Sequence, residues 1–168
     1  MRKNILLTGE SGIGKTTAIK KILERVDLSA GGFYTQEIRE NKMRTGFKII
    51  TLDGKEGLLA HIELNTRYRV GKYSVNPDDL DNIAVRSILE SLNNDLIVID
   101  EIGRMELFSE KFKKAVILAL DTRRVLGTIK VSGDLFTDSI RRRDDTEIIS
   151  VNLENRNSLV DMIVGIFS

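Results

Sequence analysis

The 168-residue chain has a formal net charge of +1, 41% hydrophobic residues and no cysteine. Its length suits a single compact core, so we expect one domain over residues 1–168. The near-neutral charge gives no electrostatic footprint for duplex nucleic acid or an acidic membrane, and the lack of cysteine excludes disulfides and thiolate metal sites.

The first predicted elements are a strand, a glycine-rich loop and a helix. Residues 5–8 form an apolar run typical of a strand buried on both faces, and the apolar positions in residues 17–26 lie on one helical stripe. Between them stands Gly9-Glu10-Ser11-Gly12-Ile13-Gly14-Lys15-Thr16, a full match to GxxxxGK[ST]. The backbone N–H groups of such a loop and the N-terminus of the following helix bind phosphate.

This loop, continued to Thr17, is therefore the predicted nucleotide-binding segment. Lys15 is expected to reach the β- and γ-phosphates as a catalytic residue, and the Thr16 hydroxyl to bind Mg²⁺. The sequence shows no evident structural partner for Lys15. A glycine-rich turn before an ordinary helix is the alternative, which the surrounding strand and helix patterns disfavour.

The next region is rich in β patterns. Residues 31–62 predict two or three antiparallel strands, with turn signals at Asn41-Lys42 and Asp53-Gly54. Residues 66–77 look irregular. Asn76 is then expected to cap a helix that starts at Pro77 and runs to about residue 92.

The second half alternates strands and helices. Strands are predicted over residues 95–101, 124–131 and 147–151, and helices over residues 109–120, 134–143 and 154–167, the first of them capped by Ser109. The predicted fold class is α/β: a single P-loop NTPase domain with a mostly parallel sheet, helices on both faces and an antiparallel β insertion near residues 31–62.

Two acidic residues end the strand at residues 95–101. Asp100 is predicted to hold Mg²⁺ opposite Thr16, on a strand expected beside the one that carries the phosphate-binding loop. Glu101 is predicted to activate water as the general base. The competing interpretation makes Glu101 structural, paired with Arg104.

Several weaker candidates remain. Arg104 and Arg141 are each predicted to stabilise charge on the transferred phosphoryl group, and the whole run Arg141–Arg143 is also explained as a solvated helix end. Glu37 and Arg39 are expected either to line an acceptor or water-access pocket or to form an ion pair. Four aromatic residues are candidates for stacking on a base, with core packing as the alternative: Phe33, Tyr34, Tyr68 and Tyr73.

The chain also resembles the small P-loop nucleoside triphosphatases called thermophilic-type NTPases, or cancer-related NTPases in vertebrates. The likeness lies in residues 31–39, 44–49, 70–76, 99–108 and 154–157. It implies an ATPase- or GTPase-like enzyme with slow turnover, broad base preference and a RecA-like or kinase-like sheet. It also implies that the nucleotide is held by the phosphate-binding loop and by Leu96, Ile97, Val98, Ile99, Asp100, Glu101, Ile102 and Gly103.

Three functions follow as hypotheses. The first is Mg²⁺-dependent hydrolysis of nucleoside triphosphates to diphosphate and phosphate. The second is transfer of the γ-phosphoryl group to a small acceptor such as a nucleoside or nucleotide. The third is a nucleotide-dependent switch or nucleic-acid-binding module, although nucleic acid is not indicated by the composition. No guanine-reading Asn-Lys-x-Asp motif occurs, so we expect loose selection among ATP, GTP and other triphosphates. Neither a signal peptide nor a transmembrane window is evident, and we expect a cytoplasmic protein. We also expect a monomer.

Overall fold

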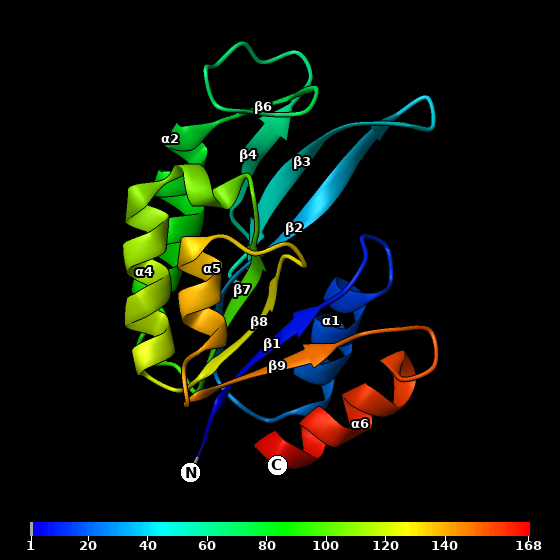
Figure 1. Ribbon diagram of the computed structural model, residues 1–168, viewed down its shortest axis with the longest axis vertical. Helices are drawn as coiled ribbons and strands as arrows, with labels where there is room; N and C mark the ends of the chain where they lie inside the picture. Colours follow the sequence, from blue (N-terminus) through cyan, green and yellow to red (C-terminus); the bar gives the residue numbers. More distant parts are fainter. Residues whose placement is uncertain (1) are drawn as a thin grey trace.

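A nine-stranded sheet runs through the molecule, and helices cover both of its faces (Figure 1). The structure is a computed structural model that describes residues 2–168. The strands are β1 (Asn4–Thr8), β2 (Ala30–Glu40), β3 (Met43–Thr51), β4 (Glu56–His61), β5 (Arg69–Val70), β6 (Tyr73–Val75), β7 (Leu96–Ile102), β8 (Val125–Ile129) and β9 (Thr146–Ser150). The helices are α1 (Lys15–Arg25), α2 (Pro77–Asp79), η1 (Leu80–Val85), α3 (Arg86–Leu89), η2 (Glu106–Phe108), α4 (Glu110–Asp121), α5 (Leu135–Arg141) and α6 (Arg156–Phe167).

The strand order is β5-β6-β4-β3-β2-β7-β8-β1-β9. β2, β7, β8, β1 and β9 form the parallel part, and β3 to β6 continue it antiparallel. β2 belongs to both parts, since Ala30–Phe33 pair with β7 and Phe33–Glu40 pair with β3. The mostly parallel α/β sheet with an antiparallel region is confirmed, and that region extends the main sheet directly.

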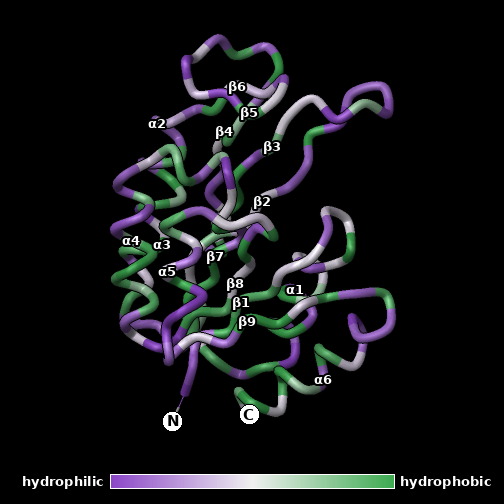
Figure 2. The backbone as a smooth tube through the Cα atoms, viewed as in Figure 1, coloured by the Kyte–Doolittle hydropathy of each residue, from purple (hydrophilic) through white to green (hydrophobic). Residues whose placement is uncertain are grey.

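Alternating side chains of the buried strands build a core on each face. In β1, Leu6 packs with the cluster that includes Phe112 of α4, whereas Ile5 and Leu7 pack with the cluster that includes Ile19 of α1 and Ile163 of α6. Figure 2 shows β1, β7 and β8 as mainly hydrophobic segments in the middle of the chain trace. Since a parallel strand is buried on both faces, its apolar run is continuous instead of alternating.

Most predicted elements are present, with two differences. The helix capped by Asn76 is a continuous helical run, but Leu80–Val85 form a π-helical segment within it. The region expected to be irregular contains the short strands β5 and β6, which are two and three residues long. Strands this short show no repeated pattern in the sequence. They are held by the sheet, since β6 pairs with β4 and β5 pairs with β6.

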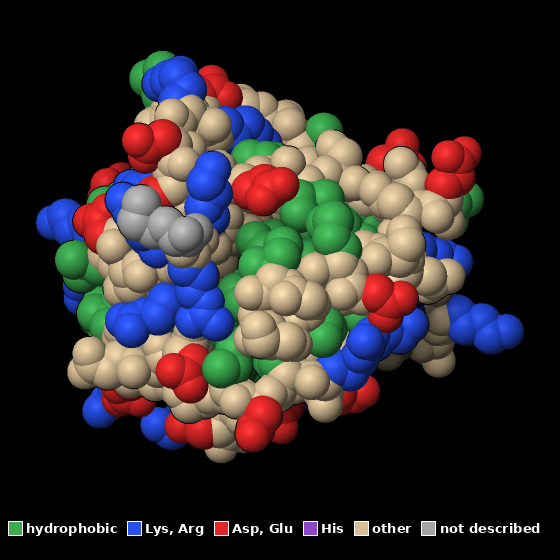
Figure 3. Space-filling view, turned by 90° about the horizontal axis from the view of Figure 1, so that it is seen from below, with side chains coloured by type: hydrophobic (Ala, Val, Ile, Leu, Met, Phe, Trp, Pro, Cys, Tyr) green, Lys and Arg blue, Asp and Glu red, His purple; other side chains and the backbone are tan. Residues whose placement is uncertain are grey.

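One end of the molecule carries the N-terminus and the amino ends of the parallel strands (Figure 1). Seen from that side, hydrophobic side chains in the middle are flanked by basic and acidic ones (Figure 3). The phosphate-binding loop follows the carboxyl end of β1, at the other end of the sheet. Within residues 2–168, every helix is too short or too polar to span a bilayer.

Asn4 joins three elements at the amino end of the sheet, and we expect its replacement to destabilise the fold. It is fully buried. Its Nδ2 donates to the Leu120 carbonyl at 2.9 Å and to Thr146 Oγ1 at 3.2 Å, and its Oδ1 accepts the Val125 N–H at 3.0 Å. Asn4→Leu leaves buried backbone groups unpaired, so the free energy of unfolding should fall by about 2–4 kcal/mol.

Urea denaturation followed by circular dichroism measures this loss. The matched control is Asn65→Leu at an exposed position, which should change the free energy by less than about 0.5 kcal/mol. Equal stability of the two variants would contradict the bridging role of Asn4.

Candidate functional site

The glycine-rich loop between β1 and α1 has the backbone of a phosphate cradle. Gly9, Gly12 and Gly14 have φ angles of 150°, 82° and 111°, a region that side-chain-bearing residues rarely adopt. A Cβ atom at Gly9 would lie 2.8 Å from the Val151 carbonyl oxygen, so the end of β9 also closes off that position. Gly14 caps the N-terminus of α1, where the free N–H groups favour an anion.

Lys15 lies under this loop with only 12% of its side chain exposed. Its Nζ donates to the Gly9 carbonyl and, at 3.4 Å, to the Glu10 carbonyl, and it lies 4.0 Å from Glu101 Oε2. The expectation that Lys15 has no structural partner is therefore wrong. The lysine is held by the loop it belongs to, with its charge facing the cavity in front of the loop.

Asp100 is a buried acid that accepts hydrogen bonds from two threonine side chains. It is 3% exposed, and its Oδ2 and Oδ1 accept hydrogen bonds from Thr16 Oγ1 at 2.6 Å and from Thr128 Oγ1 at 2.7 Å. Burial raises the pKa of Asp100, and the two hydroxyl hydrogen bonds and Lys15 oppose that shift. The sequence interpretation missed Thr128, whose only signal is a hydroxyl within the apolar strand β8.

The position of Asp100 also corrects the expected strand order. The acidic strand was expected beside the strand of the phosphate-binding loop, but β8 lies between β7 and β1. Strand order depends on how the helices cross the sheet, which a single sequence does not show. The intervening β8 is the element that supplies the Thr128 hydroxyl.

Glu101 follows directly and is partly buried. Burial raises its pKa, the Lys15 ammonium lowers it, and the neighbouring Asp100 raises it further. The ion pair that involves Glu101 is with Lys15, whereas Arg104 is exposed on the surface. The competing Glu101–Arg104 pair is therefore not the one in the structure.

These groups line a cavity of about 560 Å³. It also has walls that the sequence interpretation did not assign to the nucleotide site: Lys20, Thr35, Gln36, Phe47, Lys130 and Val131. Glu37, one of the weaker candidates, lines it too and is bound by Arg39 at 2.9 Å and by Arg44 at 3.3 Å. Glu37 therefore lines the cavity and forms a cross-strand ion pair with Arg44, whereas Arg39 is not among the residues that line the cavity. That Glu37 serves an acceptor or water stays a prediction.

Other predicted residues lie away from the cavity surface. Leu96, Ile97, Val98 and Ile99 are fully buried in the core and position the acids without lining the cavity. Ile13 is partly buried and packs against the hydrophobic cluster to which α1 and α6 contribute. Ile102 is fully buried. Gly103 is buried just beyond the acids, where its missing side chain leaves room for Glu101. Among the aromatic candidates, Phe33 and Tyr73 are core residues.

The arginine candidates have other contacts. Arg141 donates to the Lys130 carbonyl and lies 3.6 Å from Asp138. Arg143 is bound to Asp121 and Asp145, and these contacts raise its pKa. Neither Arg104 nor Arg141 is among the residues that line the cavity. Their role in stabilising transferred charge stays a prediction that requires movement of these side chains.

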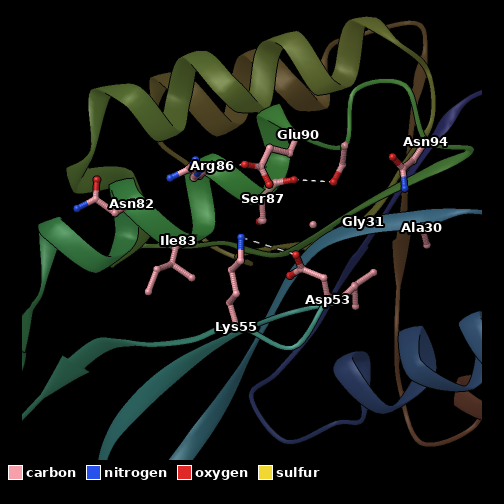
Figure 4. Close-up of a pocket in the computed structure, with 13 residues that line it drawn as sticks. Ala30, Gly31, Asp53, Lys55, Asn82, Ile83, Arg86, Ser87, Glu90 and Asn94 are labelled. Carbon is pink, nitrogen blue, oxygen red and sulfur yellow. Dashed lines mark hydrogen bonds and ion pairs between the residues drawn. The ribbon is translucent and has the colours of Figure 1, made fainter.

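A second, smaller cavity of about 230 Å³ lies at the start of β2, between the turn after β3 and the helices η1 and α3 (Figure 4). Its charged side chains are already paired, with Lys55 3.8 Å from Asp53 and Arg86 2.8 Å from Glu90. The balanced charge does not suit a polyphosphate. The cavity at the glycine-rich loop, which Lys15, Lys20 and Lys130 line, has the charge that a polyphosphate requires.

The oxygen atoms at Thr16 and Asp100 fit Mg²⁺. A hydroxyl and a carboxylate 2.6 Å apart are hard donors of the kind that magnesium prefers. No cluster of three or more His, Cys, Asp or Glu within residues 2–168 offers a complete protein cage. This arrangement suits an ion whose remaining ligands are phosphate oxygens and water.

A strand, a glycine-rich loop and a helix that present Lys15 and Thr16 to an acid on a parallel strand define the class of P-loop nucleoside triphosphatases. The family model described as "NTPase" matches residues 4–164, and the chain belongs to this family.

Named relatives cover almost the whole chain. It is 52% identical over 164 residues to the nucleoside-triphosphatase THEP1 of Thermotoga maritima, covering 96% of this chain and 94% of the relative. It is 37% identical to the cancer-related nucleoside-triphosphatase homolog of Mus musculus, covering 99% and 97%. The crystal structure of THEP1 from Aquifex aeolicus superposes with a TM-score of 0.88 at 35% identity, covering 98% and 99%. The resemblance inferred from the motifs is confirmed.

Proposed function

We propose that this chain hydrolyses nucleoside triphosphates to nucleoside diphosphate and phosphate with Mg²⁺, slowly and with broad base preference. The observation that carries the proposal is the convergence of Lys15, Asp100 and Glu101 on the cavity in front of the glycine-rich loop. The family membership and the names of the relatives support it. We further propose that the enzyme is a cytoplasmic monomer.

Different residues of the chain bind the phosphates, hold the metal ion and activate the water. The loop N–H groups and Lys15 bind the β- and γ-phosphates and stabilise the charge that develops on them. Thr16 and Asp100 would hold the Mg²⁺, which supplies further charge neutralisation at the phosphates when bound. Glu101 orients a water molecule and accepts a proton from it as the water oxygen bonds to the γ-phosphorus. The bond between the γ-phosphorus and the β,γ-bridging oxygen breaks, and the nucleoside diphosphate leaves.

A phosphate-release assay with ATP, GTP, CTP and UTP tests this function. Phosphate should appear with every triphosphate in the presence of Mg²⁺, without any added acceptor. Release confined to one base would contradict the broad preference, and no release without an acceptor would contradict hydrolysis.

A second candidate is phosphoryl transfer to a small acceptor. It is favoured by the size of the cavity, which Thr35, Glu37 and Phe47 of β2 and β3 also line, because about 560 Å³ is more room than a water molecule needs. If a panel of nucleosides and nucleotides is added to the same assay, a transferase should consume ATP much faster with the right acceptor and yield a phosphorylated product. Unchanged ATP consumption across the panel would remove this candidate.

We expect Asp100→Asn to raise the Mg²⁺ concentration needed for half-maximal activity and to lower turnover. The amide keeps the shape and can still contact Thr16, but it lacks the charge that attracts a hydrated cation. Titration of activity with Mg²⁺ measures the change. Asp78→Asn, at the start of α2, is the control and should leave the Mg²⁺ requirement unaltered. Full activity of the wild type in EDTA would contradict the metal assignment.

A further inference from the structure

A carboxyl group that the mechanism does not use is buried directly behind Glu101. Glu106 is the first residue of η2 and is only 3% exposed. Its Oε2 accepts the backbone N–H of Glu101 at 3.3 Å. That N–H belongs to the peptide that joins Asp100 to Glu101, so Glu106 contacts the main chain between the two acids of the site.

The burial of Glu106 is costly without such a role. A carboxyl in an apolar core requires hydrogen bonds to remain there, and acidic residues are rarely fully buried unless they are paired. Burial and the nearby Glu101 carboxylate raise the pKa of Glu106 well above its usual value, and its backbone hydrogen bonds oppose the shift. An apolar side chain would fill the same space at lower cost, but it would leave the Glu101 N–H unpaired.

Gly103 lies against the Glu101 side chain. A Cβ atom at this position would lie 2.6 Å from Glu101 Oε1 and 3.2 Å from its Cδ. The nearest atoms it would meet all belong to the Glu101 side chain. The missing side chain of Gly103 therefore leaves the space in which the Glu101 carboxylate lies.

We propose that Glu106 and Gly103 are positioning residues that together fix the Glu101 carboxylate at the cavity. Glu106 accepts the backbone N–H of Glu101, and Gly103 leaves room for the Glu101 side chain. The inference rests on the proposed function, in which Glu101 orients the attacking water. A base displaced by even about 1 Å loses much of its effect, since catalysis depends on near-attack geometry.

The test compares three variants in the wild-type and Glu101→Gln backgrounds. Glu106→Met keeps the volume but removes the acceptor, and it should lower kcat by about 10- to 100-fold with little change in KM. Glu106→Gln keeps an oxygen that accepts the same N–H, so its kcat should stay within about threefold of wild type. Gly103→Ala should lower kcat like the Met variant, because the nearest atoms that its Cβ meets belong to the flexible side chain of Glu101.

The Glu101→Gln background separates positioning from general structural damage. Once the base is removed, Glu106→Met and Gly103→Ala should each lower kcat by less than about threefold, because effects that act through one residue are not additive. Ser74→Ala, at a buried serine in β6, is the control for disturbing a buried polar position and should leave kcat unchanged in both backgrounds.

Several outcomes would overturn the inference. They are wild-type kcat in Glu106→Met, an equal loss in Glu106→Gln with an unchanged melting temperature, or a full further loss in the Glu101→Gln background. If Glu106→Met does not fold, Gly103→Ala and Glu106→Gln decide: wild-type kcat in the first, or a large loss in the second, rejects the proposal. Wild-type kcat in Glu101→Gln itself would instead reject the role of Glu101 in the proposed function.

Discussion

Lys15→Ala should weaken nucleoside triphosphate binding by tenfold or more, which corresponds to at least about 1.4 kcal/mol, and should abolish turnover. The lysine is held beneath the loop by the Gly9 and Glu10 carbonyls, so its ammonium is already in place before the phosphates bind. Its removal takes away a positive charge that faces two phosphate groups. The interaction of this charge with the phosphates strengthens as negative charge develops on them in the transition state.

The fold should survive this change. Lys15 makes its hydrogen bonds to two carbonyls of an exposed loop, which water reaches once the side chain is gone. Isothermal titration with a non-hydrolysable triphosphate measures binding, and circular dichroism with thermal melting checks the fold. Lys114→Ala on α4, also a lysine but exposed and distant from the loop, should bind and turn over like wild type. Unchanged turnover in Lys15→Ala would contradict the proposed role of Lys15 and of the glycine-rich loop in catalysis.

Glu101→Gln should lower kcat by about 10²- to 10⁴-fold, the usual contribution of a positioned general base. Gln keeps the size of Glu101 and does not accept a proton, so binding of the Mg²⁺-nucleotide should change little. Among the other acids that line the cavity, Asp100 is buried between two threonine hydroxyls, Glu37 is bound by two arginines, and Glu10 is exposed on the loop. We therefore expect Glu101 to be the general base.

The pH dependence gives a second measurement on this variant. A general base works in its deprotonated form, and burial raises the pKa of Glu101. The wild-type kcat should therefore fall as the pH decreases through this raised pKa, and that fall should be absent in Glu101→Gln. If the variant instead lost nucleotide affinity in proportion to kcat, Glu101 would belong to the binding shell, and water activation would have to move to Glu37 or be abandoned.

Local features of the site could be predicted from the sequence because they depend on short-range chemistry. The loop from Gly9 to Thr16 needs glycines at positive φ and a helix directly after it, and both requirements appear as consecutive residues. The same holds for the cap at Ser109, whose side chain accepts the Phe112 N–H in the structure. Asp100 and Glu101 stood out because acids at the end of an apolar strand interrupt a simple pattern.

The contacts that make the site work were decided by the tertiary structure. Thr128 reaches Asp100 only because β8 lies between β7 and β1, and the hairpin residues Thr35 and Glu37 reach the cavity only because β2 pairs with β7 before it pairs with β3. Glu106 reads in the sequence as an ordinary charged residue, although it is buried behind Glu101. The sequence by itself determined the phosphate-binding loop and most of the strands and helices, with β5 and β6 as exceptions, because hydrophobic period and backbone freedom are local. Strand order, burial of individual carboxyls and the wall of the cavity depend on contacts between residues far apart in the chain, which no local pattern contains.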